Sequence, residues 1–267
     1  MKWKKKLGKA VLLLCILYIS LGIALFFAQD LLLFHPVSLP PRYKFSFQQP
    51  FKEVNISIED RNVNLLQFST STKRKGIVLF FHGNMKNVEH YAKYPSYFTE
   101  NGWEVWMIDY PGFGKTTGKR TEQIMYNDAL LMYGMAEKQI DPDNLIIYGK
   151  SIGTGIASYL ASIKNSKRLI LETPYYSIDA LARHYFPIYP VMPMTKYAFP
   201  IHSYLKAIKV PVTIFHGTKD EVVPYAQALQ LKNEQKKTEL ITILGGTHND
   251  LSTFPLYQNK LDTLLDH

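Results

Sequence analysis

The chain has 267 residues, of which 46% are hydrophobic and 20% are charged, and its net charge is +9. This length suits one large globular domain or two small ones, and the composition excludes a collagen, a coiled coil and a disordered chain. More than half of the excess positive charge comes from five lysines before residue 10, so the basic footprint of a nucleic-acid-binding protein is absent. The single cysteine, Cys15, permits neither an intramolecular disulfide nor a cysteine-based zinc site.

An apolar segment follows the basic N-terminus, residues 1–9. Residues 10–28 contain no charged side chain, and a helix of that length, at about 1.5 Å per residue, nearly spans a hydrocarbon core of about 30 Å. We expect a single transmembrane anchor over 10–28, with the lysines in the cytoplasm and the remaining chain on the opposite side, periplasmic or extracytoplasmic. The alternative is a signal peptide cleaved near Gly22 or Ala24, although the apolar run continues past both.

The remaining chain predicts an α/β fold. We expect residues 29–53 to form a tether and 54–267 to form the domain, a mostly parallel eight-stranded sheet covered by helices. The predicted strands are Val54–Ile58, Val63–Phe68, Gly76–Phe81, Glu104–Asp109, Leu145–Tyr148, Arg168–Glu172, Val212–Phe215 and Glu239–Leu244. The predicted helices are Val88–Glu100, Glu122–Lys138, Ile152–Ile163, Tyr225–Asn233 and Leu256–Leu265.

The longest connection, residues 173–209, follows the sixth predicted strand. Its five prolines argue against one continuous helix, and its eight aromatic residues, with Met192 and Met194, argue against disorder. We expect a cap insertion that forms the roof of a binding pocket, with Tyr185, Phe186 and Tyr189 contacting the bound molecule. The alternative is an insertion that only covers the core.

A candidate nucleophile lies in Gly149-Lys150-Ser151-Ile152-Gly153, between a predicted strand and a predicted helix. This is the context of a nucleophile elbow, where a bulky side chain in place of either glycine would collide across the turn that exposes the serine. The five-residue pattern alone also arises by chance as a glycine-rich turn. Its position after an apolar strand favours Ser151 as the nucleophile.

A catalytic serine needs a base and an orienting carboxylate, and in this type of fold they follow in the order acid, then histidine. Asp220 follows the strand Val212–Phe215, and His248 follows the strand Glu239–Leu244. Both are expected at the edge of the sheet that carries Ser151, and Glu221 is the rival to Asp220.

Two further groups of residues complete the predicted site. His82 and His216 each precede a glycine in a Phe-His-Gly turn, where a neutral ring holds the loop together. The oxyanion donors are expected to be the backbone amides of Ile152 and Asn84, with Met85 as an alternative to Asn84. No cofactor and no metal are implied, since the chain contains no His-x-x-x-His pair or clustered carboxylate set.

Five motifs together resemble the alpha/beta-hydrolase superfamily and, more narrowly, its singly membrane-anchored serine hydrolases. In the family's order they are His82-Gly83-Asn84, Asp109-Tyr110-Pro111-Gly112-Phe113-Gly114, Gly149-Lys150-Ser151-Ile152-Gly153, His216-Gly217-Thr218-Lys219-Asp220 and Gly246-Thr247-His248. The resemblance covers about residues 54–265 and implies an alpha/beta-hydrolase fold with a Ser151, His248 and Asp220 triad. Known members of that subgroup include protein depalmitoylases and lipid esterases, but the cysteine-rich N-terminal segment typical of the depalmitoylases is missing here.

The resemblance and the spacing together predict a carboxylesterase-like or lipase-like serine hydrolase that forms an acyl-enzyme on Ser151. A membrane anchor and an aromatic cap favour an acyl ester of a lipid or lipid-like substrate over a polar metabolite. The alternatives are a thioesterase or peptidase that uses the same triad, and a non-catalytic, membrane-tethered binding protein.

Overall fold

The computed structural model describes residues 2–191 and 194–266, and it contains the predicted eight-stranded sheet. The strand order is β10-β9-β8-β7-β4-β6-β3-β2, with β2 and β3 antiparallel to their neighbours and the other pairs parallel. The strands are β2 Phe51–Ile58, β3 Arg61–Phe68, β4 Gly76–Phe81, β6 Trp103–Ile108, β7 Leu145–Lys150, β8 Arg168–Glu172, β9 Val212–Gly217 and β10 Thr238–Ile243.

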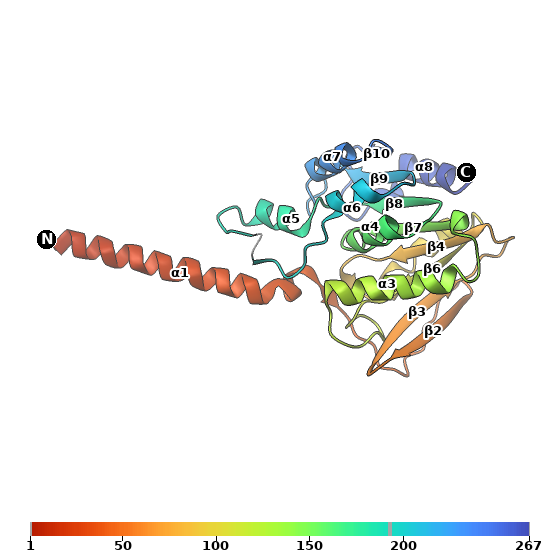
Figure 1. Ribbon diagram of the computed structural model, residues 1–267, viewed down its shortest axis with the longest axis horizontal. Helices are drawn as coiled ribbons and strands as arrows, with labels where there is room; N and C mark the ends of the chain where they lie inside the picture. The colour runs from red at the N-terminus through yellow and green to blue at the C-terminus, as the bar shows by residue number, and fades with distance from the viewer. Residues whose placement is uncertain (1, 192–193, 267) are drawn as a thin grey trace.

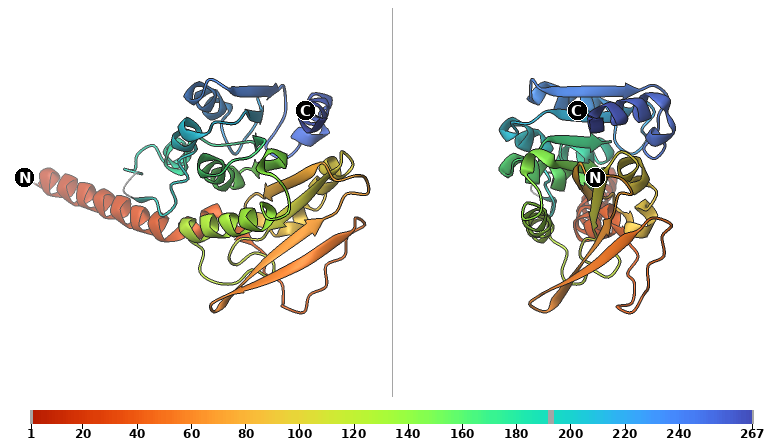
Figure 2. Two further views of the ribbon diagram at one scale, coloured as in Figure 1. Left: turned by 45° about the vertical axis from the view of Figure 1, so that its right-hand side comes forward. Right: turned by 90° about the vertical axis from the view of Figure 1, so that its right-hand side faces the viewer.

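Both faces of the sheet are covered by helices. Side chains alternate along each strand, so that Leu79 and Phe81 of β4 enter one apolar cluster and Val78 and Phe80 enter the other. Burial on both sides explains why the central strands are continuous apolar runs. The first face is covered by α3 Glu122–Ala136, α4 Gly153–Ile163, α6 Ile201–Ala207 and α7 Tyr225–Glu234, and the second by α2 Tyr94–Thr99 and α8 Pro255–Asp266 (Figure 2).

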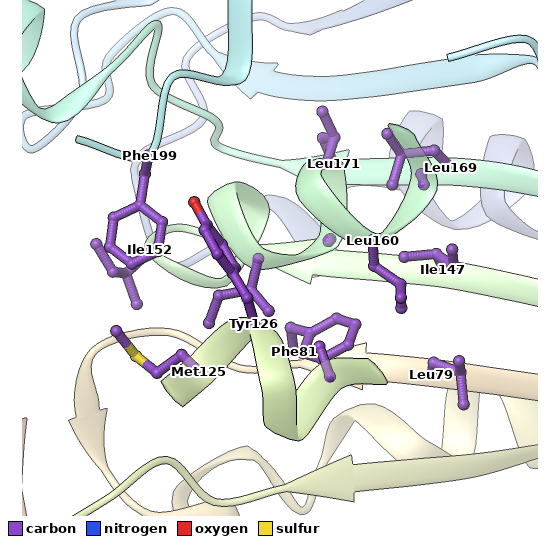
Figure 3. Close-up of a cluster of buried hydrophobic side chains, with 14 of the residues drawn as sticks. Leu79, Phe81, Met125, Tyr126, Ile147, Ile152, Leu160, Leu169, Leu171 and Phe199 are labelled. Carbon is purple, nitrogen blue, oxygen red and sulfur yellow. The ribbon is translucent and has the colours of Figure 1, made fainter. Parts of the chain in front are cut away.

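The cluster on the first face holds the nucleophile's helix against the sheet. Figure 3 shows Phe81, Ile147 and Leu171 from three neighbouring strands beside Leu160 of α4 and Tyr126 of α3. These side chains are almost entirely buried. The turn between β7 and α4 is therefore supported by a continuous buried cluster.

Two local elements differ from the sequence prediction. The single helix expected over Val88–Glu100 is split into a 3₁₀ turn, η1 Val88–Tyr91, and the separate helix α2, because Pro95 fits only in the first turn of a helix. Two further 3₁₀ turns are η2 Pro142–Asn144 and η4 Leu251–Thr253. A two-stranded parallel sheet of β1 His35–Pro36 and β5 Met85–Lys86 is too short to give a periodic signal.

The N-terminal helix is longer than the predicted anchor. Helix α1 spans Lys2–Leu33, so it continues beyond residue 28 into the expected tether. It ends shortly before Pro36, because a proline disfavours helical geometry in the residue that precedes it. It is long and apolar enough to cross a membrane, and only 6% of its most apolar part is buried. Figure 1 shows α1 projecting away from the domain.

Part of the expected tether, residues 34–53, packs on the domain. Phe34 is 1% exposed and its ring lies 5.0 Å from that of Tyr197. Phe45 is also buried, and β2 begins at Phe51, three residues before the predicted domain boundary. These aromatic residues belong to the core because water would otherwise contact their large apolar area.

In its described residues, the predicted cap contains the α-helices α5 Ile178–Tyr185 and α6, which agrees with the proline-based exclusion of one continuous helix. Tyr175 and Ile178 near its start belong to the buried core, and residues 183–188 are its exposed part. Ile201 and Leu205 of α6 pack in the same cluster as α4, so α6 belongs to the helical layer and the predicted cap, 173–209, was too long. Of the predicted segments, Met1, Met192, Pro193 and His267 lie outside the described residues.

Candidate active site

Ser151 occupies a strained turn between β7 and α4. Its φ of +51° lies in the left-handed region, which is uncommon for a residue other than glycine and typical of functional turns. A Cβ atom on Gly149 would lie 2.7 Å from the Cα of Thr154, and one on Gly153 would lie 2.2 Å from the carbonyl oxygen of Phe81. Both glycines of the motif are therefore required by close backbone contacts.

Ser151, His248 and Asp220 form one chain of hydrogen bonds. Nε2 of His248 lies 2.9 Å from Oγ of Ser151, and Nδ1 lies 2.8 and 3.0 Å from the two carboxylate oxygens of Asp220. Because a carboxylate can only accept, Nδ1 carries a proton and leaves Nε2 free to accept one from the serine. Three loops at the carboxyl ends of β7, β9 and β10 bring these side chains together.

The carboxylate of Asp220 is fully buried and is held in place by its own loop. It accepts hydrogen bonds from the backbone amides of Val222 and Val223 at 2.9 and 2.7 Å. Burial raises the pKa of Asp220, but the hydrogen bonds from His216 and His248 outweigh it, so the pKa lies well below its usual range. Asp220 is therefore ionised at neutral pH.

The depressed pKa makes the stability contribution of Asp220 dependent on pH. A carboxylate whose pKa is lower in the folded than in the unfolded protein stabilises the fold above about pH 4 and loses that contribution as the pH falls. The difference in unfolding free energy between wild type and Asp220→Asn should therefore be constant above about pH 5 and should shrink steadily as the pH falls below about 4. Chemical denaturation at several pH values measures this, with Asp60→Asn in the exposed β2–β3 turn as the control, and a difference that stays constant with pH would contradict it.

The other two histidines at strand ends are His216, in the last part of β9, and His82, directly after β4, and neither is hydrogen-bonded to Ser151 among the described residues. His216 is buried, donates from Nε2 to the carbonyl of Val223 at 2.9 Å and lies 3.2 Å from the Asp220 carboxylate. His82 is also buried, with Nδ1 2.7 Å from the carbonyl of its neighbour Gly83. His216 thus braces the loop that carries the acid.

The residues predicted to supply the oxyanion donors, Asn84 and Ile152, line a cavity together with Ser151. Within the described residues, the backbone amides of Asn84 and Ile152 donate no hydrogen bond, whereas that of Met85 donates to the hydroxyl of Tyr91 at 3.2 Å. An oxyanion donor must be free to bind its ligand, so the geometry favours Asn84 over Met85. Asn84 is fixed at the end of α1, because its side chain donates to the carbonyl of Leu33 at 2.9 Å.

A cavity of about 360 Å³ opens beside Ser151. Tyr185, Phe186 and Tyr189, the three cap residues expected to bind substrate, line it. Sequence reasoning missed a second wall, which α1 supplies through Leu25, Phe26, Gln29, Leu32 and Leu33. No pattern marked these residues, because residues 10–28 of α1 are almost all apolar and show no polar face.

Sequence reasoning also missed a buried ion pair beneath the nucleophile. Lys150 and Glu172 are register partners at the ends of β7 and β8, and their charged groups lie 2.5 Å apart. Lys150 also donates to the carbonyl of His248 at 3.2 Å. The sequence feature that could have predicted this ion pair is a lysine and a glutamate, each at the end of an otherwise apolar strand.

Glu172 is completely buried and accepts hydrogen bonds from the hydroxyls of Tyr94, Tyr148 and Tyr257. Burial raises the pKa of Glu172, but Lys150 and these hydrogen bonds lower it more, so the residue is a carboxylate. Among residues 2–191 and 194–266, no group of three potential ligand side chains is placed to hold a metal ion.

Comparison with known proteins places the chain in a family. The sequence family described as serine aminopeptidase, S33, matches residues 72–200. Human alpha/beta hydrolase domain-containing protein 17B is 32% identical over 200 residues, which cover 72% of this chain and 66% of that protein. The 17C protein of Xenopus tropicalis is 29% identical over 71% of this chain and 61% of its own length, so the match spans slightly less than two thirds of these relatives.

The fold is shared with solved structures of low sequence identity. An esterase from Pyrococcus furiosus superposes with a TM-score of 0.65 at 18% identity, over 88% of this chain and 97% of that one. The sheet order, the strained serine turn and the order of the five motifs agree with these similarities. The chain belongs to the alpha/beta-hydrolase superfamily.

Proposed function

We propose that the protein is a membrane-anchored serine hydrolase that cleaves carboxylic acyl esters through an acyl-enzyme. The observation that carries this proposal is the hydrogen-bonded chain from Asp220 through His248 to Ser151, with the serine opening into an apolar cavity. A scaffold that only binds would have no chemical need for this chain or for the strained serine.

The geometry supports a standard acyl-transfer sequence. His248 accepts the hydroxyl proton of Ser151 as Oγ attacks the ester carbonyl, and the amides of Asn84 and Ile152 stabilise the oxyanion. His248 then donates that proton to the leaving alcohol, which leaves an acyl group on Ser151. A water molecule, deprotonated by His248, attacks the acyl carbonyl and releases the acid, while Asp220 stabilises the imidazolium at each step.

The lining of the cavity favours an acyl chain as the bound group. Among the described residues that line it, Glu221 is the only one with a charged side chain, and most of the others are aliphatic or aromatic. Such a surface binds methylene groups better than a polar metabolite. We infer a lipid or lipid-like ester as the substrate.

The N-terminal helix supports a membrane location. Lysines precede its apolar run and the next charged residue, Asp30, follows it. By the positive-inside rule the N-terminus lies in the cytoplasm and the catalytic domain lies on the other side of the membrane.

A peptidase is the second candidate, because the matching sequence family is described as a serine aminopeptidase and Glu221 could bind a substrate amino group. Purified full-length protein is therefore treated with a fluorophosphonate probe, and the adduct is mapped by mass spectrometry. We expect it on Ser151, with turnover of 4-nitrophenyl esters exceeding that of matched thioesters and of aminoacyl 4-nitroanilides. Absence of an adduct would favour a binding protein, and faster anilide cleavage would favour a peptidase.

A further inference from the structure

One face of α1 packs directly against the loop that follows α5 (Figure 1). The rings of Tyr18 and Tyr189 stack with centroids 4.7 Å apart, and each hydroxyl donates to a backbone carbonyl on the other segment. A Cβ atom on Gly22 would lie 3.0 Å from the Tyr189 ring. Because Gly22 has no side chain, the ring can lie flat against the helix.

Closer to the domain, polar groups fix the same two segments together. The side chain of Gln29 donates to the carbonyl of Met194 at 2.6 Å and accepts from the amide of Lys196 at 2.7 Å. Asp30 accepts from the Tyr197 hydroxyl at 2.6 Å and pairs with the Lys196 ammonium at 3.2 Å. The position of α1 relative to the cap is thus set at both ends of the contact.

Helix α1 has two distinct apolar faces. The face toward the cap carries the cavity-lining residues, which recur every three or four positions as on one side of a helix: Leu25, Phe26, Gln29, Leu32 and Leu33. The opposite face carries Ile23, Phe27 and Leu31, which are 54%, 70% and 73% exposed. One face therefore contacts the cavity, while the other is free to contact lipid.

With Asp30 at the membrane surface and α1 crossing the bilayer, the contact between α1 and the cap would extend into the hydrocarbon. Tyr18 precedes Asp30 by 12 residues, which is about 18 Å along a helix, and the hydrocarbon of one leaflet is about 15 Å thick. We call residues 185–191 and 194–195 the cap tip. The sequence from Tyr185 to Thr195 contains no charge and three prolines, which lack the N–H donors that are costly to bury in lipid.

We propose that the cap tip enters the bilayer beside α1, and that an acyl chain already resident in that leaflet reaches Ser151 through the cavity between them. The anchor helix is then one wall of the acyl site as well as an anchor. This inference rests on the proposed function, since it assigns the source and the path of the ester that Ser151 cleaves.

The proposal makes α1 a determinant of acyl-chain selectivity. Each methylene buried in the cavity contributes about 0.8 kcal/mol, or roughly a fourfold change in kcat/KM. Shortening the cavity by two or three methylenes should therefore lower the rate for long chains by tenfold or more and leave acetyl esters unchanged.

Two identical substitutions on opposite faces of α1 test the wall. Full-length protein in phosphatidylcholine vesicles is assayed with 4-nitrophenyl acetate and 4-nitrophenyl dodecanoate. Leu25→Trp, on the cavity face, should lower kcat/KM for dodecanoate at least tenfold, and Leu31→Trp, on the lipid face, should change it less than twofold. Equal effects of the two variants on dodecanoate would overturn the proposal.

A second pair covers the case in which the bulky Leu25→Trp side chain disturbs folding. Phe26→Ala enlarges the cavity and should shift the preferred acyl length upward, whereas its neighbour Phe27→Ala should not. Acetate hydrolysis separates the two levels of inference. If the wild type does not cleave 4-nitrophenyl acetate, the proposed function is wrong. If the wild type cleaves acetate but the two variants of each pair have the same dependence on acyl length, only the proposed role of α1 is wrong.

Membrane insertion of the cap tip is tested by depth-dependent quenching. In a Cys15→Ser background, a fluorophore is attached at Ile188→Cys on the cap tip or at Ile163→Cys, which lies at the end of α4 on the opposite edge of the sheet. Both native side chains are exposed, at 69% and 52%. Nitroxide-labelled acyl chains should quench the label at 188 and not that at 163, and an unquenched label at 188 would overturn the insertion.

Discussion

Replacing Ser151 by alanine is expected to lower kcat/KM for 4-nitrophenyl acetate by about 10⁴-fold or more. Oγ of Ser151 is the only nucleophile within hydrogen-bond distance of His248 among the described residues, at 2.9 Å. The substitution removes one half-buried hydroxyl whose hydrogen bond is to His248, so the unfolding free energy should change little. Steady-state kinetics with purified full-length protein, together with a denaturation curve, measure both quantities.

The same experiment distinguishes the members of the hydrogen-bonded chain. His248→Ala should cost about as much as Ser151→Ala, and the double variant should cost no more than either, because the two residues act as one unit. Asp220→Asn should cost about 10⁴-fold, since the neutral amide favours the wrong tautomer of His248. Glu221→Gln should cost far less. A larger loss from Glu221→Gln than from Asp220→Asn would show that the acid was misassigned.

The second large effect is expected on stability, from the ion pair beneath the nucleophile. Lys150→Met leaves the Glu172 carboxylate buried with three tyrosine hydroxyls and no positive charge. Removing one partner of a buried pair costs about 3–5 kcal/mol of unfolding free energy. Because Lys150 also donates to the carbonyl of His248, catalysis should fall as well.

Two variants control for the loss of one lysine. Lys164→Met removes a half-exposed partner of Glu137 at 3.8 Å and should cost about 0–1 kcal/mol. Adding Glu172→Gln to Lys150→Met should recover part of the loss, because a neutral amide still accepts the tyrosine hydrogen bonds without an unpaired charge. If denaturation gives equal losses for Lys150→Met and Lys164→Met, the ion pair is not what holds this region.

Much of the fold could be predicted because its signals are local. The strand Gly76–Phe81 is a continuous apolar run, as burial on both faces requires. The turn at Ser151 was predictable because its glycines meet backbone atoms that any elbow of this kind brings close. Asp220 and His248 were predicted from their places after strands, because parallel strands end at one edge of the sheet.

The features that could not be predicted from the sequence are those that depend on which parts of the chain pack against each other. A helix that is apolar all round has no pattern to show which face is covered, so Leu25 and Phe26 could not be told from Ile23 and Phe27. The end of the cap was misplaced for a related reason, since an aromatic sequence buries equally well in a roof or in the helical layer.

The sequence by itself determined the sheet, the elbow and the order of the candidate nucleophile, acid and base, because periodicity, turn chemistry and chain order are properties of neighbouring residues. Only the tertiary structure decided that α1 forms a wall of the cavity and that Lys150 pairs with Glu172. Both depend on contacts between residues far apart in the chain, and their free energy exists only once the sheet register and the docking of α1 bring those residues together.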